Sequence, residues 1–338
     1  MAKASCYIGL DVAFAKGKHL PVVICTWNGD CLVPLPLRQL QFTPPQGKGN
    51  LATFDCELVS RFAEDAARYI VQVCNELGLI PTRIGIDAPS SPKKDDVARR
   101  LCEKGLDQAG ISCFATPSAD EFDVIREKAR KHLASGGAVS KLPHANQLWM
   151  IVGFALFERL SQLAPCLEVF PQAIVRAIDA GDIHKSHLGA VETQLMAAAQ
   201  FTGWPTSRDT LKLDDIAWGD KHDKLDAYLS AWVASLEESN RIPYGEPPDD
   251  AIWIPKTNHG LKVKYAAGST DGNPKIQATQ AVKPSTPTYK VLCPGCGKFE
   301  FKQWPLGWDA HAAHKCAGVK AIDPKERKAE YRRKYLTD

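Results

Sequence analysis

Short apolar runs open the chain, and their length and spacing are typical of β-strands. The first run, residues 6–11, ends in an aspartate, and the runs at 21–27 and 37–42 follow after turn residues. Residues 83–89 form a similar run, whose aspartate is followed by a proline that cannot continue a central strand. Residues 166–171 form the last run. The pattern predicts five strands.

Between and after these runs, apolar residues recur three or four positions apart, as in amphipathic helices. Residues 57–77 have this spacing, and Gly78 supplies the stop. Residues 222–238 have it too, with one apolar stripe that should pack on a sheet or helix layer. Shorter helices are expected at 95–109, 121–134, 145–163, 172–180 and 188–201. Strands interspersed with helices predict an α/β domain over residues 1–255.

Length and composition place this domain in a chain with an appendage. At 338 residues with 44% hydrophobic content, the chain exceeds one ordinary domain and can bury a large core. No apolar run reaches the roughly 18 residues of a membrane span, and the first residues lack the apolar segment of a signal peptide. These features predict a cytoplasmic protein with no membrane partner.

Most of the eleven cysteines are scattered singly through predicted helices and strands. That distribution is typical of reduced thiols in a cytosolic protein. These eight cysteines are Cys6, Cys25, Cys31, Cys56, Cys74, Cys102, Cys113 and Cys166. The other three gather near the C-terminus with two histidines, which predicts a metal site there.

Charge is distributed unevenly along the chain. Residues 256–338 hold 16 lysines and arginines against 7 aspartates and glutamates, whereas residues 1–255 hold 26 against 32. A basic appendage on an acidic body indicates a polyanionic partner such as nucleic acid, although a solvated linker also collects lysines. From their composition, residues 256–289 are predicted to be a basic flexible linker and residues 321–338 a basic tail.

Acidic residues fall at the ends of predicted strands and at the start of the last helix. The candidate catalytic acids are Asp11, Asp87, Glu168, Asp223 and Asp226. Catalytic sites in α/β sheets lie at the edge where the strands end, so these acids are expected to meet there. Each acid taken singly is also explained as a turn former or helix cap, and Asp223 is placed to cap the last helix.

Several carboxylates in one pocket repel each other unless a cation neutralises them. Oxygen ligands of this kind suit Mg²⁺ or Mn²⁺. Two such ions about 4 Å apart can activate water and stabilise the departing oxygen in phosphodiester hydrolysis. The acids therefore predict a metal-dependent hydrolase.

Four phrases of the body resemble a known family, the predicted nucleases of the RNase H-like superfamily called domain of unknown function 429. The phrases are Ile8–Asp11, Ile84–Pro89, Leu167–Pro171 and His222–Trp232, which together span roughly residues 5–255. The resemblance implies a mixed five-stranded sheet flanked by helices. It also implies metal-binding acids at Asp11, Asp87 and Asp226, with Glu168 and Asp223 supporting them. The family's glycine-rich turn after the first acid is replaced here by residues 12–18.

Residues 290–320 carry a second metal motif, C-x2-C-x14-H-x4-C. The spacing resembles a C2HC variant of the ββα zinc finger, with Zn²⁺ in a closed structural site. The expected zinc ligands are Cys293, Cys296, His311 and Cys316. His314 competes with His311 for the third position. Such a finger binds DNA, RNA or a protein partner.

Basic residues near the acids have two interpretations. Lys16, Lys18 and His19 follow Asp11 and are placed to contact phosphate, and His222 is placed to move a proton during product departure. The alternative is that the lysines are ordinary surface residues and that the histidine beside Asp223 is one at the N-terminus of a helix.

These residues and motifs suggest three alternative functions. The first is a metal-dependent nuclease that hydrolyses DNA or RNA, with the finger delivering the nucleic acid. The second is an adaptor that keeps the fold and binds nucleic acid or protein without turnover. The third, an actin-like phosphotransferase, needs paired glycine-rich phosphate loops, and the sequence offers no convincing pair.

Overall fold

The computed structural model describes residues 3–180, 189–206, 213–257, 291–292 and 300–301. Contacts divide the chain into two units, Met1–Ala266 and Ala267–Asp338. In the second unit the described residues form two short antiparallel strands, β8 (Val291–Leu292) and β9 (Glu300–Phe301). The four expected zinc ligands, most of the predicted linker and the basic tail lie outside the described residues.

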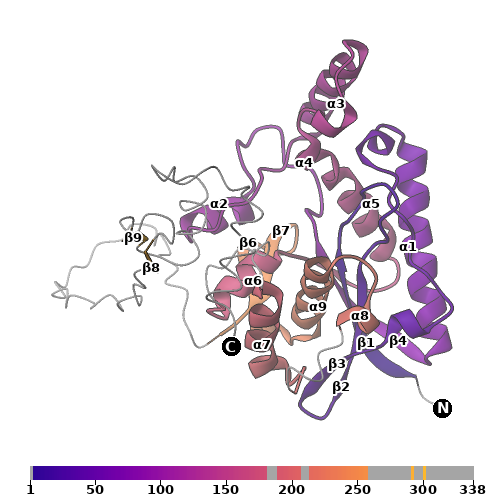
Figure 1. The fold of residues 1–338 in the computed structure, drawn as a ribbon, viewed down its shortest axis with the longest axis vertical. Coiled ribbons are helices and arrows are strands. Elements are labelled where there is room, and N and C mark those ends of the chain that lie inside the picture. The colour runs from indigo at the N-terminus through magenta and orange to yellow at the C-terminus, as the bar shows by residue number, and fades with distance from the viewer. Residues whose placement is uncertain (1–2, 181–188, 207–212, 258–290, 293–299, 302–338) are drawn as a thin grey trace. The chain divides into compact units, whose positions relative to one another are not determined.

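The first unit is built on a mixed sheet with helices around it (Figure 1). The sheet has seven strands in the order β3-β2-β1-β4-β5-β7-β6. Strands β1, β4, β5 and β7 run parallel to one another, whereas β2, β3 and β6 pair antiparallel with their neighbours. The strands are β1 (Ala4–Asp11), β2 (Val22–Asn28), β3 (Cys31–Pro34), β4 (Leu79–Asp87), β5 (Cys166–Val169), β6 (Arg241–Glu246) and β7 (Asp250–Pro255).

The α/β class predicted from the sequence is confirmed, but the sheet has seven strands where five were expected. The expected strand at 37–42 is wrong, because that segment holds a 3-10 helix at Leu37–Gln39. The third strand is instead β3, which folds back on β2 through a tight turn at Gly29 and ends at a proline. Strands β6 and β7 were not predicted, and β6 contains Pro243. Proline is tolerated there because β6 is an edge strand.

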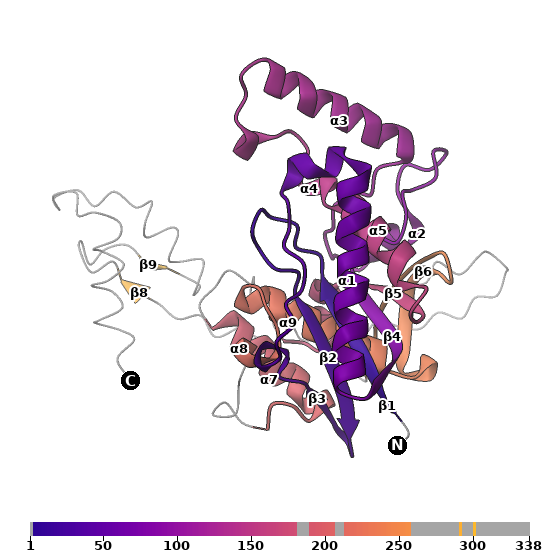
Figure 2. The same ribbon diagram turned by 90° about the vertical axis from the view of Figure 1, so that its right-hand side faces the viewer.

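Helices cover both faces of this sheet (Figure 2). They are α1 (Cys56–Glu76), α2 (Leu101–Gln108), α3 (Ala119–Ala134), α4 (Ala145–Leu148), α5 (Met150–Leu160), α6 (Pro171–Ala177), α7 (Ala190–Thr202), α8 (Leu213–Ile216) and α9 (Lys221–Ser235). The expected helix at 57–77 is α1, capped at its start by Asp55, whose carboxylate accepts hydrogen bonds from Glu57 N and Leu58 N. The expected helix at 145–163 is divided at Trp149 into α4 and α5.

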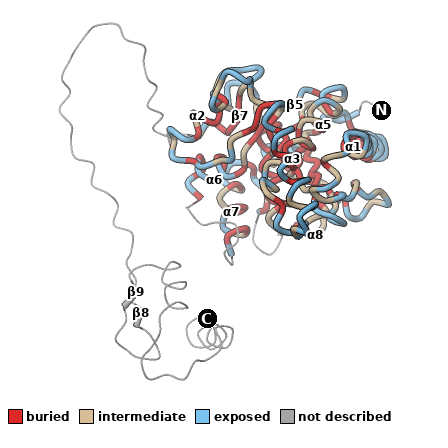
Figure 3. The backbone as a smooth tube through the Cα atoms, turned by 90° about the horizontal axis from the view of Figure 1, so that it is seen from above, coloured by how far each residue is buried: buried red, intermediate tan, exposed pale blue. Residues whose placement is uncertain are grey.

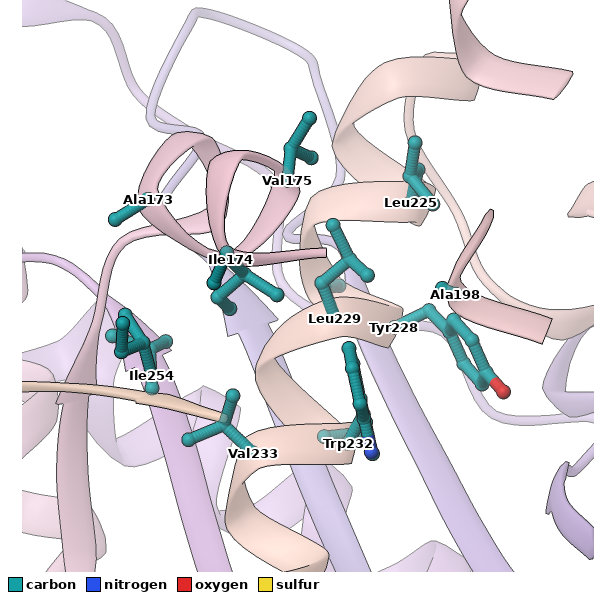
Figure 4. Packing of buried hydrophobic residues seen from close by; sticks show 14 of the residues in the cluster. Ala173, Ile174, Val175, Ala198, Leu225, Tyr228, Leu229, Trp232, Val233 and Ile254 are labelled. Carbon is teal, nitrogen blue, oxygen red and sulfur yellow. The ribbon is translucent and has the colours of Figure 1, made fainter. Parts of the chain in front are cut away.

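Two apolar cores lie on opposite faces of the sheet, inside a shell of exposed residues (Figure 3). Ile8 and Ile84 point into the core that α1 and α5 cover, whereas Val23 and Cys25 point into the core around α9. Every residue of α9 from Asp223 to Ser235 is buried, although its pattern predicted a single apolar stripe. The reason is that α9 is enclosed by the sheet on one side and by α6 and α7 on others, so its whole circumference is covered (Figure 4).

Two further features are the absence of membrane-spanning helices among the described residues and the state of the scattered cysteines. Among the described residues, no helix has the length and apolar character needed to cross a membrane. The eight scattered cysteines are free thiols.

Candidate metal site

Asp11 and Asp87 lie side by side at one edge of the sheet. They end β1 and β4, which are parallel neighbours, and they are partners in the register of those two strands. Neighbouring strands are about 4.8 Å apart. The sequence expectation that these two acids meet at the carboxyl ends of the strands therefore agrees with the register.

The two aspartates also share a face of the sheet, the one that α9 covers. A Cβ atom on Gly9 would overlap the Ala227 carbonyl oxygen, and one on Gly85 would overlap the Ser230 carbonyl oxygen, so both glycines face α9. Side chains alternate between faces along a strand. Asp11 and Asp87 follow these glycines by two residues and therefore face the same way.

Helix α9 brings its first acids to the same edge. Asp223 and Asp226 precede Ala227 and Ser230 by four residues, which is about one helical turn. The start of α9 lies at the strand ends, because Gly219 packs against Pro21, whose carbonyl oxygen accepts a hydrogen bond from Asp11 N. Asp223 and Asp226 are buried, which is costly for carboxylates unless they are hydrogen-bonded or bind a cation.

Asp223 also has the capping role that the sequence left open. Asp220 and Asp223 form a capping box at the start of α9, in which Asp220 N donates to Asp223 Oδ2 at 3.2 Å. The other oxygen of Asp223 lies 2.9 Å from His222 Nε2. Among the described residues, Asp220, His222 and Asp223 form a group whose ligand atoms all lie within 4.8 Å of one another. Asp223 is the predicted acid that belongs to this closely spaced group.

Glu168 is placed differently from the other four predicted acids. Its register partner on β4 is Ile86, which packs in the core beneath α1 and α5. Glu168 thus belongs to the opposite face of the sheet from Asp11 and Asp87. Its two oxygens accept hydrogen bonds from Arg100, at 2.8 Å and 2.7 Å, and one of them also accepts from Ser90 N at 2.9 Å. The Arg100 guanidinium therefore balances the charge of Glu168.

Arg100 is a buried residue of this region that the sequence did not single out. Burial alone would lower the pKa of Arg100, but its neighbours, the Glu168 carboxylate foremost and Asp250 among them, together raise the pKa above its usual range. Burial raises the pKa of the Glu168 carboxyl, and Arg100 opposes that rise. The one available signal was the acid inside an apolar strand, because a buried carboxylate needs a partner. Which residue supplies that partner cannot be read from local spacing.

Basic and aromatic side chains border the acids. Lys18 pairs with Asp220, and this hydrogen bond raises the pKa of Lys18, with Asp223 and Asp11 adding to the effect. Lys18 thus lies at the start of α9, beside Asp220. Lys16 is exposed.

His19, the third candidate for phosphate contact, is held against its neighbours. Its Nδ1 lies 2.8 Å from the Pro44 carbonyl oxygen, and its ring centroid lies 4.6 Å from that of Trp218. The Arg38 guanidinium lies over the same tryptophan ring at 4.6 Å. His19 and Arg38 thus both pack against Trp218, in the segment that leads into α9.

Comparisons with protein-family models, with curated proteins and with solved structures found no match. The residues of the chain are thus the basis of its proposed function.

Proposed function

We propose that the protein is a metal-dependent nuclease that hydrolyses phosphodiester bonds of DNA or RNA. One observation carries the proposal: Asp11 and Asp87 end adjacent parallel strands in register, and α9 brings Asp226 to the same edge. We assign Asp11, Asp87 and Asp226 as ligands of Mg²⁺ or Mn²⁺, with Asp223 supporting them from the capping box.

The donor set fits such ions. The acids at this edge come from three different elements, offer oxygen ligands and no thiolate, and are partly or fully buried. When bound, divalent ions supply Lewis acidity that activates water and stabilises the departing oxygen. In the chain itself, the acids provide the negative charge that retains the ions, and we assign Lys18, which pairs with Asp220, to contact the substrate's phosphate.

The sheet supports an RNase H-like scaffold as part of this proposal. Five of its strands, in the order β3-β2-β1-β4-β5, form a mixed sheet flanked by helices, as the resemblance implies. Strands β7 and β6 extend that sheet beyond β5. A reducing compartment such as the cytoplasm suits the eight free thiols, and we include it in the proposal.

The activity is tested with the purified full-length chain and end-labelled single-stranded and double-stranded DNA and RNA. We expect cleavage of at least one substrate in Mg²⁺ or Mn²⁺ and none in EDTA, because the acids act through a bound ion. Gel separation of the products measures the rate. Binding of a substrate with no metal-dependent cleavage would contradict the nuclease proposal and favour the adaptor.

We also propose a structural zinc finger near the C-terminus that engages nucleic acid or a protein partner. Strands β8 and β9 pair antiparallel and flank Cys293 and Cys296 in the sequence. A two-stranded hairpin around a pair of cysteines matches the first half of a ββα finger. The remaining ligands in the proposal are His311 and Cys316.

Zinc content tests the finger independently of any nuclease activity. The purified chain is expected to contain one zinc ion per molecule by atomic emission, and Cys293→Ser is expected to lose it, because closed structural sites need all four ligands. Cys56→Ser, an exposed cysteine of α1, is the matched control and should retain zinc. One zinc retained by Cys293→Ser would refute the ligand set, and comparison of His311→Ala with His314→Ala decides the third ligand.

A further inference from the structure

A buried network of charges includes Glu168, which lies on the face of the sheet opposite the proposed metal site. Arg100 and Glu168 are each about nineteen-twentieths buried, with 4% and 5% of their side chains exposed, and they pair through two parallel hydrogen bonds. Arg100 Nε also lies 3.3 Å from Asp250 Oδ1 on β7. Asp250 in turn accepts hydrogen bonds from Leu101 N and Cys102 N at the start of α2. The hydrogen bonds and ion pairs around the guanidinium thus link β5, β7 and the start of α2.

The network reaches the segment that leaves Asp87. Glu168 Oε2 accepts a hydrogen bond from Ser90 N, three residues after Asp87. Between them, Ala88 packs so closely on α5 that a Cβ atom on Gly153 would lie 2.5 Å from the Ala88 Cβ. The backbone beyond Asp87 is therefore fixed at Ala88 by packing and at Ser90 by the Glu168 carboxylate.

Stability alone does not account for these charges. Transferring an ion pair from water into the protein interior costs several kcal/mol per ion. A protein with an apolar pair of similar volume in its place is often as stable or more stable. What an apolar pair does not offer is an acceptor for the Ser90 amide. Groups that hold a metal ligand in place typically contribute about 10- to 100-fold to metal affinity.

We propose that Glu168, itself held by Arg100, is a positioning residue that fixes Asp87 for metal binding through the Ser90 amide. The proposal rests on the proposed function, because it takes Asp87 as a metal ligand. It assigns Glu168 an indirect role in place of a direct one, and it gives Arg100 a role in the site.

Two double variants separate positioning from stability. Glu168→Leu with Arg100→Met replaces the pair with apolar groups and removes the acceptor for Ser90 N. Glu168→Gln with Arg100→Met also removes both charges but keeps an amide oxygen as acceptor. We expect the leucine variant to bind Mn²⁺ about tenfold or more weakly than the parent, and the glutamine variant to recover most of that loss. Electron paramagnetic resonance titration with Mn²⁺ measures the affinity without any substrate, and urea unfolding measures stability.

A control on the same strand distinguishes a general loss of stability. Arg83 on β4 donates hydrogen bonds to Ala234 O and Leu236 O at the far end of α9. Arg83→Met is expected to lower the urea midpoint and leave Mn²⁺ affinity unchanged. If the leucine and glutamine variants bind Mn²⁺ equally well, the Ser90 bond has no positioning role and the inference is overturned. Should the leucine variant fail to fold, a glutamine variant that folds but binds Mn²⁺ tenfold more weakly than the parent also overturns it.

Failure of the proposed function gives a different result. If the parent binds Mn²⁺ and Asp87→Asn does not, the metal site stands and the double variants decide the positioning role. If the parent does not bind Mn²⁺, the metal site and the positioning role both fall.

Discussion

Asp87→Asn is expected to reduce metal-dependent cleavage by about a thousandfold while the protein remains folded. Asparagine has the shape of aspartate but lacks the negative charge that a divalent ion requires. A bound metal contributes several kcal/mol of transition-state stabilisation, and each tenfold in rate corresponds to about 1.4 kcal/mol. Because Asp11 is the register partner of Asp87, Asp11→Asn is expected to have a similar effect. Single-turnover cleavage in Mn²⁺ measures the loss.

Asp30→Asn is the matched control for this experiment. Asp30 is exposed in the turn between β2 and β3, at the opposite edge of the sheet, so the same chemical change there should leave the rate unaltered. Cleavage that persists undiminished in Asp87→Asn would identify the activity as a contaminant, or as chemistry at another site.

Gly85→Ala is expected to destabilise the protein strongly, because the added methyl group would meet the backbone of α9. Its Cβ atom would overlap the Ser230 carbonyl oxygen, and α9 backbone cannot move aside as a flexible side chain would. Overpacking of a core costs about 1–3 kcal/mol and occasionally more, and we expect about 3 kcal/mol or more here. Urea unfolding of purified protein measures the change. Gly9→Ala is expected to behave in the same way, since its Cβ atom would overlap the Ala227 carbonyl oxygen.

A loss of Mn²⁺ affinity should accompany the loss of stability, because displacing α9 also moves Asp226. Ser5→Ala, an exposed change on β1, is the control and should leave both quantities unchanged. Full stability in Gly85→Ala would mean that the close approach of α9 to the sheet is wrong, and with it the meeting of Asp226 with the strand ends.

Local patterns were sufficient for the elements whose period is strong. Residues 57–77 had helical spacing that ended at a glycine stop, and α1 occupies nearly that range. The positions of the remaining strands depend on which segments can pair with a neighbour in the sheet. The third strand lies at Cys31–Pro34 because it folds back on β2, whereas residues 37–42, of which only half are apolar, begin with a 3-10 helix. Strand β6 tolerates Pro243 because it is an edge strand, a property of the whole sheet.

The candidate site also contains some features that local patterns predict and others that depend on the pairing of strands. Asp11 and Asp87 could be proposed from the sequence because each ends an apolar run, and parallel pairing brings such ends together. The face to which an acid points depends on register, which no local pattern gives. Glu168 was therefore grouped with acids from which the sheet separates it. Its partner Arg100 lies 68 residues away, beyond the reach of any spacing rule.

The order of strands along the sheet has a consequence for incomplete chains. Strand β7 comes last among the strands of the first unit, yet it pairs with β5, whose only other neighbour is β4. A polypeptide ending before Asp250 would leave one side of β5 with unpaired amide and carbonyl groups, a surface that recruits strands from other molecules. Synthesis interrupted there would thus yield fragments prone to aggregation through the exposed side of β5.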